Sequence, residues 1–141
     1  MNFLASLLLS AMLSVPSFWG TNMEQAQQQA KQESKLILLN FSGSDWCGPC
    51  MKLRRDVFDS DEFLAYAKDK LVLVNADFPR QKKNRLDAEQ VKRNEALAEK
   101  YNTKGTFPYT LLLDANGRVL KTWEGNSGLT PSQFIDELKQ R

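Results

Sequence analysis

The sequence of 141 residues contains no histidine, only two cysteines and almost no net charge. Without histidine the chain cannot form a Ser-His-Asp or Cys-His catalytic arrangement or a zinc site with imidazole ligands. Two cysteines cannot supply a four-thiolate metal site, so we expect neither a metal nor another cofactor. Nineteen basic and 17 acidic side chains give a net charge of +2, which does not favour nucleic acid as a partner. These absences leave the two thiols as the candidates for chemistry.

The N-terminal stretch has no charged side chain before Glu24 and is almost wholly apolar over residues 3–15. This is the length of a signal-peptide core, and it is shorter than the roughly 20 residues of a membrane-spanning helix. Small residues around Pro16 favour cleavage after Ser17. We therefore expect residues 1–17 to be a signal peptide and residues 18–141 to form a single domain that is exported, periplasmic or secreted, where disulfides persist. An ordered N-terminal helix packed on the domain is the alternative.

The rest of the chain alternates between helical and extended patterns. Continuous apolar runs predict buried strands over residues 35–42 and 71–77. Two further strands, over residues 109–113 and 118–123, flank an Asn-Gly turn and predict a hairpin. Together with the helices between them, these strands indicate an α/β fold with a central mixed sheet that has a parallel part and an antiparallel edge.

Helices are predicted over residues 23–34, 50–58 and 88–101. Two more helices are predicted, each beginning after a capping residue. Asp59 is the first of these, with Glu62 completing a capping box, and Thr130 is the second, with Gln133 in the same role. The inward face of the helix over residues 88–101 is predicted to consist of Val91, Ala96, Leu97 and Tyr101.

Both cysteines lie in the segment Trp46-Cys47-Gly48-Pro49-Cys50, directly after the first predicted strand and at the start of a helix. The free N–H groups and the dipole of a helix N-terminus favour a thiolate at Cys47, which is the form that attacks a disulfide. Cys50, one turn further on, could then attack the mixed disulfide. Half of a zinc site would look the same, but the other half is absent. A purely structural disulfide remains an alternative, although so small a loop removes little entropy from the unfolded chain.

This segment resembles the thioredoxin family, whose signature is Trp-Cys-Gly-Pro-Cys between a strand and a helix. The resemblance extends from about Lys35 to the C-terminus and implies a thioredoxin fold, with helices on both faces of the sheet and the Cys-x-x-Cys motif at a helix N-terminus. It also implies a cis-proline facing the dithiol, which corresponds to Pro108. A trans proline at a strand entrance is the alternative. By this resemblance the substrate would bind along a platform of Trp46, Gly48, Pro49, Phe107 and Pro108.

The chain also departs from the thioredoxin pattern. Thioredoxins carry a buried acid in the strand before the motif, and the corresponding residue here is Asn40, which cannot accept a proton. The family's lysine on the next strand is replaced by Leu73 or Val74. Proton transfer from Cys50 would then need water or Asp45, whose other possible role is to form a turn.

Residues 78–87 form a basic insertion relative to small thioredoxins. Its cations are Arg80, Lys82, Lys83 and Arg85. They could attract an acidic partner through their local positive potential, or they could simply keep the loop solvated.

These features predict a monomeric thiol-disulfide oxidoreductase that reduces or isomerises protein disulfides. Cys47 would attack the substrate, Cys50 would resolve the mixed disulfide, and a membrane-bound electron donor would restore the dithiol. The Gly-Pro dipeptide is that of thioredoxin, whose potential of about −270 mV favours reduction. The alternatives are a dithiol oxidase or folding isomerase, and a peptide-binding module whose dithiol has no catalytic role.

Overall fold

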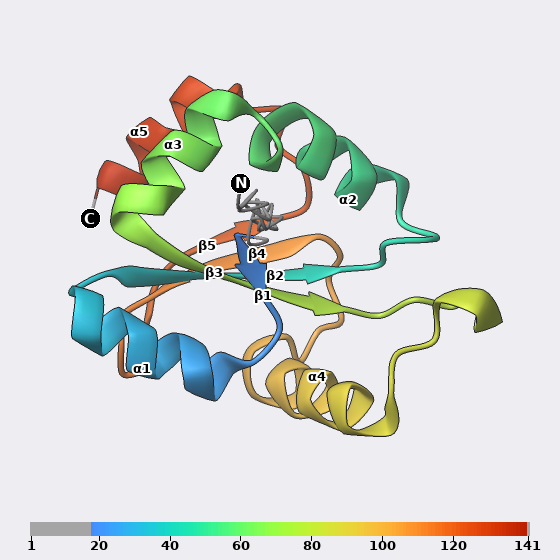
Figure 1. Cartoon of the computed structure of the whole chain (residues 1–141). Coiled ribbons are helices and arrows are strands. Elements are labelled where there is room, and N and C mark those ends of the chain that lie inside the picture. Colours follow the sequence, from blue (N-terminus) through green and yellow to red (C-terminus); the bar gives the residue numbers. More distant parts are fainter. Residues whose placement is uncertain (1–17, 141) are drawn as a thin grey trace, which may run out of the picture.

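The structure is a computed structural model that describes residues 18–140. The predicted signal peptide, residues 1–17, and residue 141 lie outside the described residues. A five-stranded sheet has the order β1-β3-β2-β4-β5 (Figure 1). Its strands are β1 Trp19–Gly20, β2 Leu36–Ser42, β3 Leu71–Asp77, β4 Tyr109–Leu113 and β5 Val119–Glu124. The first three pair in parallel, while β4 and β5 add an antiparallel edge, which confirms the predicted mixed α/β sheet.

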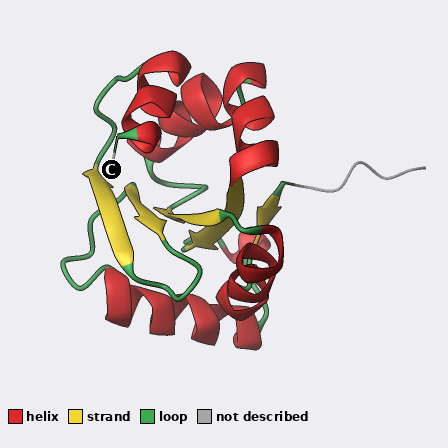
Figure 2. Ribbon diagram, turned by 90° about the vertical axis from the view of Figure 1, so that its left-hand side faces the viewer, coloured by secondary structure: helices red, strands yellow, loops and turns green. Residues whose placement is uncertain are grey.

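Helices cover both faces of this sheet (Figures 1 and 2). They are α1 Met23–Glu33, α2 Gly48–Leu53, α3 Asp61–Lys70, α4 Ala88–Tyr101 and α5 Pro131–Lys139. A π-helical turn at Arg54–Phe58 continues α2, and a short 3-10 turn at Lys82–Asn84 interrupts the basic loop. In Figure 1, α2, α3 and α5 lie on one face, and α1 and α4 lie on the other.

The core has two parts because successive side chains of a strand point to opposite faces of a sheet. In β2, Leu38 packs with residues of α3 and α5, whereas Ile37 and Leu39 pack with residues of α1 on the other face. A strand covered on both faces has to be apolar at nearly every position, which explains the continuous runs in β2 and β3.

The start of α3 differs from the prediction. The cap is Ser60, whose Oγ accepts a hydrogen bond from the Phe63 N–H at 3.2 Å, and not Asp59. The π-helical turn extends far enough for the Asp59 N–H to donate to the Arg54 carbonyl, so Asp59 still belongs to the preceding turn. The expected capping box with Glu62 was therefore wrong, whereas the box of Thr130 and Gln133 at the start of α5 is confirmed.

The inward face of α4 was also only partly predicted. Val91 is exposed, and the buried positions are Gln90 and Asn94. The Asn94 side-chain amide donates to the Asp77 carbonyl at 2.9 Å, and that of Gln90 donates to the Thr21 carbonyl at 2.9 Å. Polar side chains can be buried here because they satisfy backbone groups, which hydropathy patterns do not register. Of the other residues expected on the inward face, Leu97 and Tyr101 pack against the core, whereas Ala96 is exposed.

Candidate functional site

Three chain segments meet at one edge of the sheet. The parallel strands β2 and β3 end there, with Ser42 opposite Asp77, and the antiparallel strand β4 begins there, with Tyr109 opposite Phe41. This is the right-hand edge in Figure 1, where the chain leaves β2 towards α2 and leaves β3 towards the basic loop. The topology therefore brings together the cysteine motif, the basic loop and the segment before β4.

The two cysteines form a disulfide at the start of α2, and both are 4% exposed. Cys47 is the N-cap of this helix, and its Sγ accepts a hydrogen bond from the Cys50 N–H at 3.2 Å. A backbone donor at Sγ and the helix N-terminus both stabilise negative charge on that sulfur. Gly48 and Pro49 are exposed and form the outer turn of the motif. Of the two cysteines, Cys47 is therefore the better placed to carry a thiolate.

The side chain of Trp46 is held from several sides. Its indole N–H donates to the Phe78 carbonyl at 2.7 Å, and its ring packs edge to face with that of Phe107, with centroids 5.4 Å apart. Phe78 and Phe107 are also in contact, with ring centroids 5.6 Å apart. The three aromatic residues come from the three segments that meet at this edge, so each of these segments helps to place Trp46.

These aromatic residues line an open groove, which reaches the cysteine motif through Trp46 and which we call the aromatic groove. Its lining residues are Trp46, Phe78, Pro79, Arg80, Gly105 and Phe107. The peptide bond between Phe107 and Pro108 is cis, and Pro108 is buried. Of the expected platform, the structure thus brings Trp46 and Phe107 together in the groove, whereas Gly48, Pro49 and Pro108 lie outside its lining.

Asp45 anchors the basic loop. One carboxylate oxygen accepts the Arg80 N–H at 2.9 Å, and the other accepts the Gln81 N–H at 2.9 Å and the Asn84 side-chain amide at 3.1 Å. These hydrogen bonds, that of Arg80 first, hold the pKa of Asp45 below its usual value of 3.8. A carboxylate with a lowered pKa is a weaker base, so this geometry favours the anchoring role over proton transfer from Cys50.

Asn40 is buried in β2, where its side-chain amide donates to the Thr110 hydroxyl at 3.0 Å. Leu73 and Val74 are buried core residues of β3. None of these three side chains can accept a proton from a thiol.

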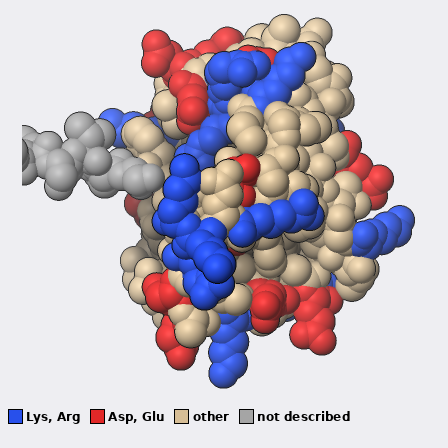
Figure 3. All heavy atoms as spheres, turned by 90° about the vertical axis from the view of Figure 1, so that its right-hand side faces the viewer, with Lys and Arg blue, Asp and Glu red and all other residues tan. Residues whose placement is uncertain are grey.

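Arg80 is the feature of this site that sequence reasoning missed. Its guanidinium carbon lies 3.7 Å from the centroid of a Trp46 ring, a cation–π contact between residues 34 positions apart. The basic composition of the loop was visible in the sequence, but nothing in it indicated which cation would reach the motif. Figure 3 shows the face on which these basic side chains gather.

Comparisons with known proteins agree with this geometry. A family model described as a thioredoxin-like domain matches residues 23–141. The chain is 38% identical over 96 residues to the disulfide bond reductase DsbH of Chlamydia pneumoniae. This alignment covers 68% of this chain and 56% of the relative. It is also 34% identical to the thioredoxin-related protein DsbJ of the same organism, in an alignment over 148 residues that covers 96% of this chain and 41% of the relative. This chain thus spans about half the length of these two curated relatives.

Solved structures share the fold. A DsbH oxidoreductase superposes with a TM-score of 0.76 at 32% identity, covering 83% of this chain and 78% of that one. A thioredoxin from Thermus thermophilus gives a TM-score of 0.64 at 15% identity, covering 86% of this chain and 84% of that one, a likeness of fold alone. Within residues 18–140, no helix has the length and apolar character needed to cross a membrane. With its sheet order, its cysteine pair at the start of α2 and a family match over most of its length, the chain belongs to the thioredoxin-like family.

Proposed function

We propose that this chain is a thiol-disulfide oxidoreductase that reduces protein disulfides through Cys47 and Cys50. The observation that carries the proposal is the placement of Cys47 Sγ at the N-cap of α2, hydrogen-bonded to the Cys50 N–H and next in sequence to a groove-lining tryptophan. This arrangement stabilises the thiolate that thiol-disulfide exchange requires.

The reaction begins with the reduced dithiol. The Cys47 thiolate attacks one sulfur of the substrate disulfide, the substrate S–S bond breaks, and a mixed disulfide forms while the first substrate sulfur leaves as a thiolate. Cys50 then loses its proton to water and attacks Cys47 Sγ, which releases the second substrate sulfur and closes the Cys47–Cys50 disulfide. Overall the dithiol gives two electrons to the substrate, and the two substrate thiolates take up two protons from solvent, which balance those that Cys47 and Cys50 have lost to solvent.

The direction we propose is reduction. The Gly48-Pro49 dipeptide between the cysteines is that of thioredoxin, whose potential is about −270 mV, and the relative DsbH is named a disulfide bond reductase. The same dithiol could isomerise a wrongly paired disulfide if the mixed disulfide were attacked by another substrate thiol. We further propose that residues 1–17 direct export, that residues 18–141 act as a monomeric domain, and that a membrane-bound dithiol donor restores the reduced form.

The test is reduction of insulin disulfides by the dithiothreitol-recycled protein. We expect turnover above that of dithiothreitol alone by the wild type and not by Cys47→Ser. After the dithiothreitol is removed, Cys50→Ser should trap a mixed disulfide with insulin, because that variant can attack but cannot resolve. A wild-type protein that turns over no disulfide, but still binds a peptide ligand after its own two cysteines are alkylated, would instead support the alternative of a peptide-binding module.

The redox potential of the dithiol separates reductase from oxidase. Equilibration with glutathione should give a value near that of thioredoxin, about −270 mV, whereas a value near the roughly −120 mV of strong oxidants would overturn the proposed direction.

A further inference from the structure

The four cations of the basic loop have no acidic partners in the described part of the chain. Within residues 18–140 the ion pairs involve other basic residues, those at positions 35, 54, 55 and 118. Figure 3 shows Lys and Arg side chains gathered in a band across the face that the loop occupies. A group of like charges without internal partners leaves a positive potential on this face, which attracts anionic groups.

Arg80 is the loop cation that lines the aromatic groove. Its main-chain N–H is held by the Asp45 carboxylate, and its guanidinium lies over a Trp46 ring. Trp46 is itself fixed by its hydrogen bond to the Phe78 carbonyl. The guanidinium is therefore positioned at the wall of the groove by contacts that use its flat face and leave its charge unpaired.

The donors of this guanidinium are free to bind a ligand. No hydrogen bond from the Arg80 side chain to any residue within 18–140 accompanies the cation–π contact. A guanidinium presents its N–H groups in a planar fork that matches the two oxygens of a carboxylate. The ring of Trp46 screens one face of that fork from water. These features suit the side chain of an aspartate or glutamate.

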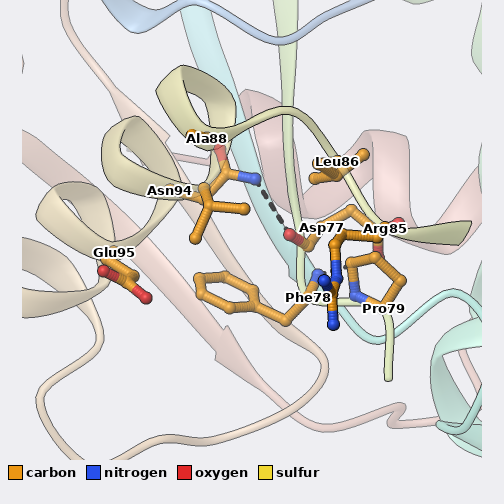
Figure 4. Close-up of a pocket in the computed structure, with 9 residues that line it drawn as sticks. Asp77, Phe78, Pro79, Arg85, Leu86, Ala88, Asn94 and Glu95 are labelled. Atoms are coloured by element: carbon orange, nitrogen blue, oxygen red, sulfur yellow. Dashed lines mark hydrogen bonds between the residues drawn. The ribbon is translucent and has the colours of Figure 1, made fainter. Parts of the chain in front are cut away.

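A second cation lies further along the same loop. Arg85 lines a neighbouring pocket, which shares Phe78 and Pro79 with the aromatic groove. In Figure 4, Arg85 lies beside Pro79, and Glu95 on α4 lies on the opposite side. Asp77, at the end of β3, is the second acidic residue of this pocket. The adjoining pocket thus carries one cation and two carboxylates, so the positive charge at the groove itself comes from Arg80.

We propose that the disulfide substrates of this protein are acidic. Each would carry an aspartate or glutamate near its reacting cysteine, and the carboxylate of that acid would pair with Arg80. The inference rests on the proposed function and names the substrate class of the same site. Asp45 acts here as a positioning residue, because its hydrogen bonds hold the loop segment that carries Arg80.

The experiment compares two peptides with the same internal disulfide, one carrying glutamates beside a cysteine and the other carrying glutamines. For the wild type we expect kcat/KM to be about three- to fivefold higher for the glutamate peptide, the size expected of one exposed charge pair. The preference should shrink as salt is raised, because exposed charges are screened.

The variants locate this preference. Arg80→Gln should bring the ratio between the two peptides close to one, Arg80→Lys should keep part of it through charge alone, and Asp45→Ala should lower it by releasing the loop. Lys31→Gln is the matched control. It removes one exposed positive charge from the last turn of α1, a helix that contributes no residue to the lining of the aromatic groove, and it should retain the full ratio.

The outcomes distinguish the two levels of the proposal. A wild type that reduces both peptides at equal rates, or an Arg80→Gln variant that keeps the full ratio, would overturn the acidic preference and leave the oxidoreductase activity standing. An Arg80→Gln variant that lowers both rates equally would also overturn it, because the ratio would not change. Failure of the wild type to reduce either peptide would instead contradict the proposed function.

Discussion

At the scale of single residues, Gly43 is needed for a close approach and not for an unusual backbone conformation. A Cβ built on it would lie 2.5 Å from the Trp46 Cζ2 atom and 2.6 Å from the indole nitrogen, closer than real atoms approach. The indole nitrogen is the atom that donates to the Phe78 carbonyl. The glycine before the motif therefore makes room for the tryptophan that lines the groove.

We expect Gly43→Ala to displace the Trp46 ring and break this hydrogen bond, at a cost of about 1–3 kcal/mol in the free energy of unfolding. Urea denaturation followed by circular dichroism measures this cost, and tryptophan fluorescence reports the displacement.

The control for that measurement is Gly48→Ala. A Cβ on Gly48 would meet no atom within 4 Å, so its effect on stability should be small. Equal stability of the two variants would contradict the role assigned to Gly43.

At the scale of elements, the chain from Gly48 to Lys70 is helical in two pieces separated by a short break. The π-helical turn ends where the Asp59 N–H donates to the Arg54 carbonyl, and α3 starts anew with Ser60 as its cap. Ser60 also donates its hydroxyl hydrogen to the Val57 carbonyl at 2.6 Å, so one side chain ties the end of the first piece to the start of the second.

Ser60→Ala should therefore lower the free energy of unfolding by about 1 kcal/mol, the usual cost of losing an N-cap. Asp59→Ala should cost less, because its ion pair with Arg54, at 3.6 Å, joins two largely exposed side chains. Thermal and urea unfolding of the two variants give the comparison, and a larger loss for Asp59→Ala would restore Asp59 as the cap.

At the scale of the whole molecule, the face of the sheet covered by α3 and α5 holds a cluster of aromatic rings among its aliphatic side chains. Phe63 is fully buried, and its ring centroid lies 5.2 Å from that of Phe58 and 6.0 Å from that of Phe134. Trp123, from β5, joins the same cluster, with its centroid 4.8 Å from that of Phe134. This cluster connects the helical segment after the cysteine motif with both α5 and the antiparallel edge of the sheet.

Phe63→Ala should cost about 3–5 kcal/mol, because it removes a large ring and leaves a cavity between several elements. Val119→Ala in β5 serves as the control, since Val119 is 43% exposed and its truncation leaves no cavity. Urea unfolding measures both, and a cost for Phe63→Ala no greater than that of the control would show that the cluster does not bear on stability.

Much of the fold could be predicted because the relevant signals are local. The runs that became β2 and β3 are apolar at almost every position, the Asn-Gly turn lies between β4 and β5, and Thr130 with Gln133 caps α5. The position of the two cysteines at a helix start is local as well, since strand, turn and helix follow one another within residues 36–53. β1 escaped prediction because two residues carry no periodicity, and they are ordered by pairing with β3.

By itself, then, the sequence determined which segments had to be buried and that one dithiol would begin a helix, because apolar patterning, caps and turns act between near neighbours in the chain. The tertiary structure alone decided what surrounds that dithiol. Asp45 became an anchor for residues more than 30 positions away, and Arg80 came to lie over Trp46. Such contacts depend on strand order and register, which bring the ends of β2 and β3 and the start of β4 to one edge, and no local pattern specifies which side chains will meet there.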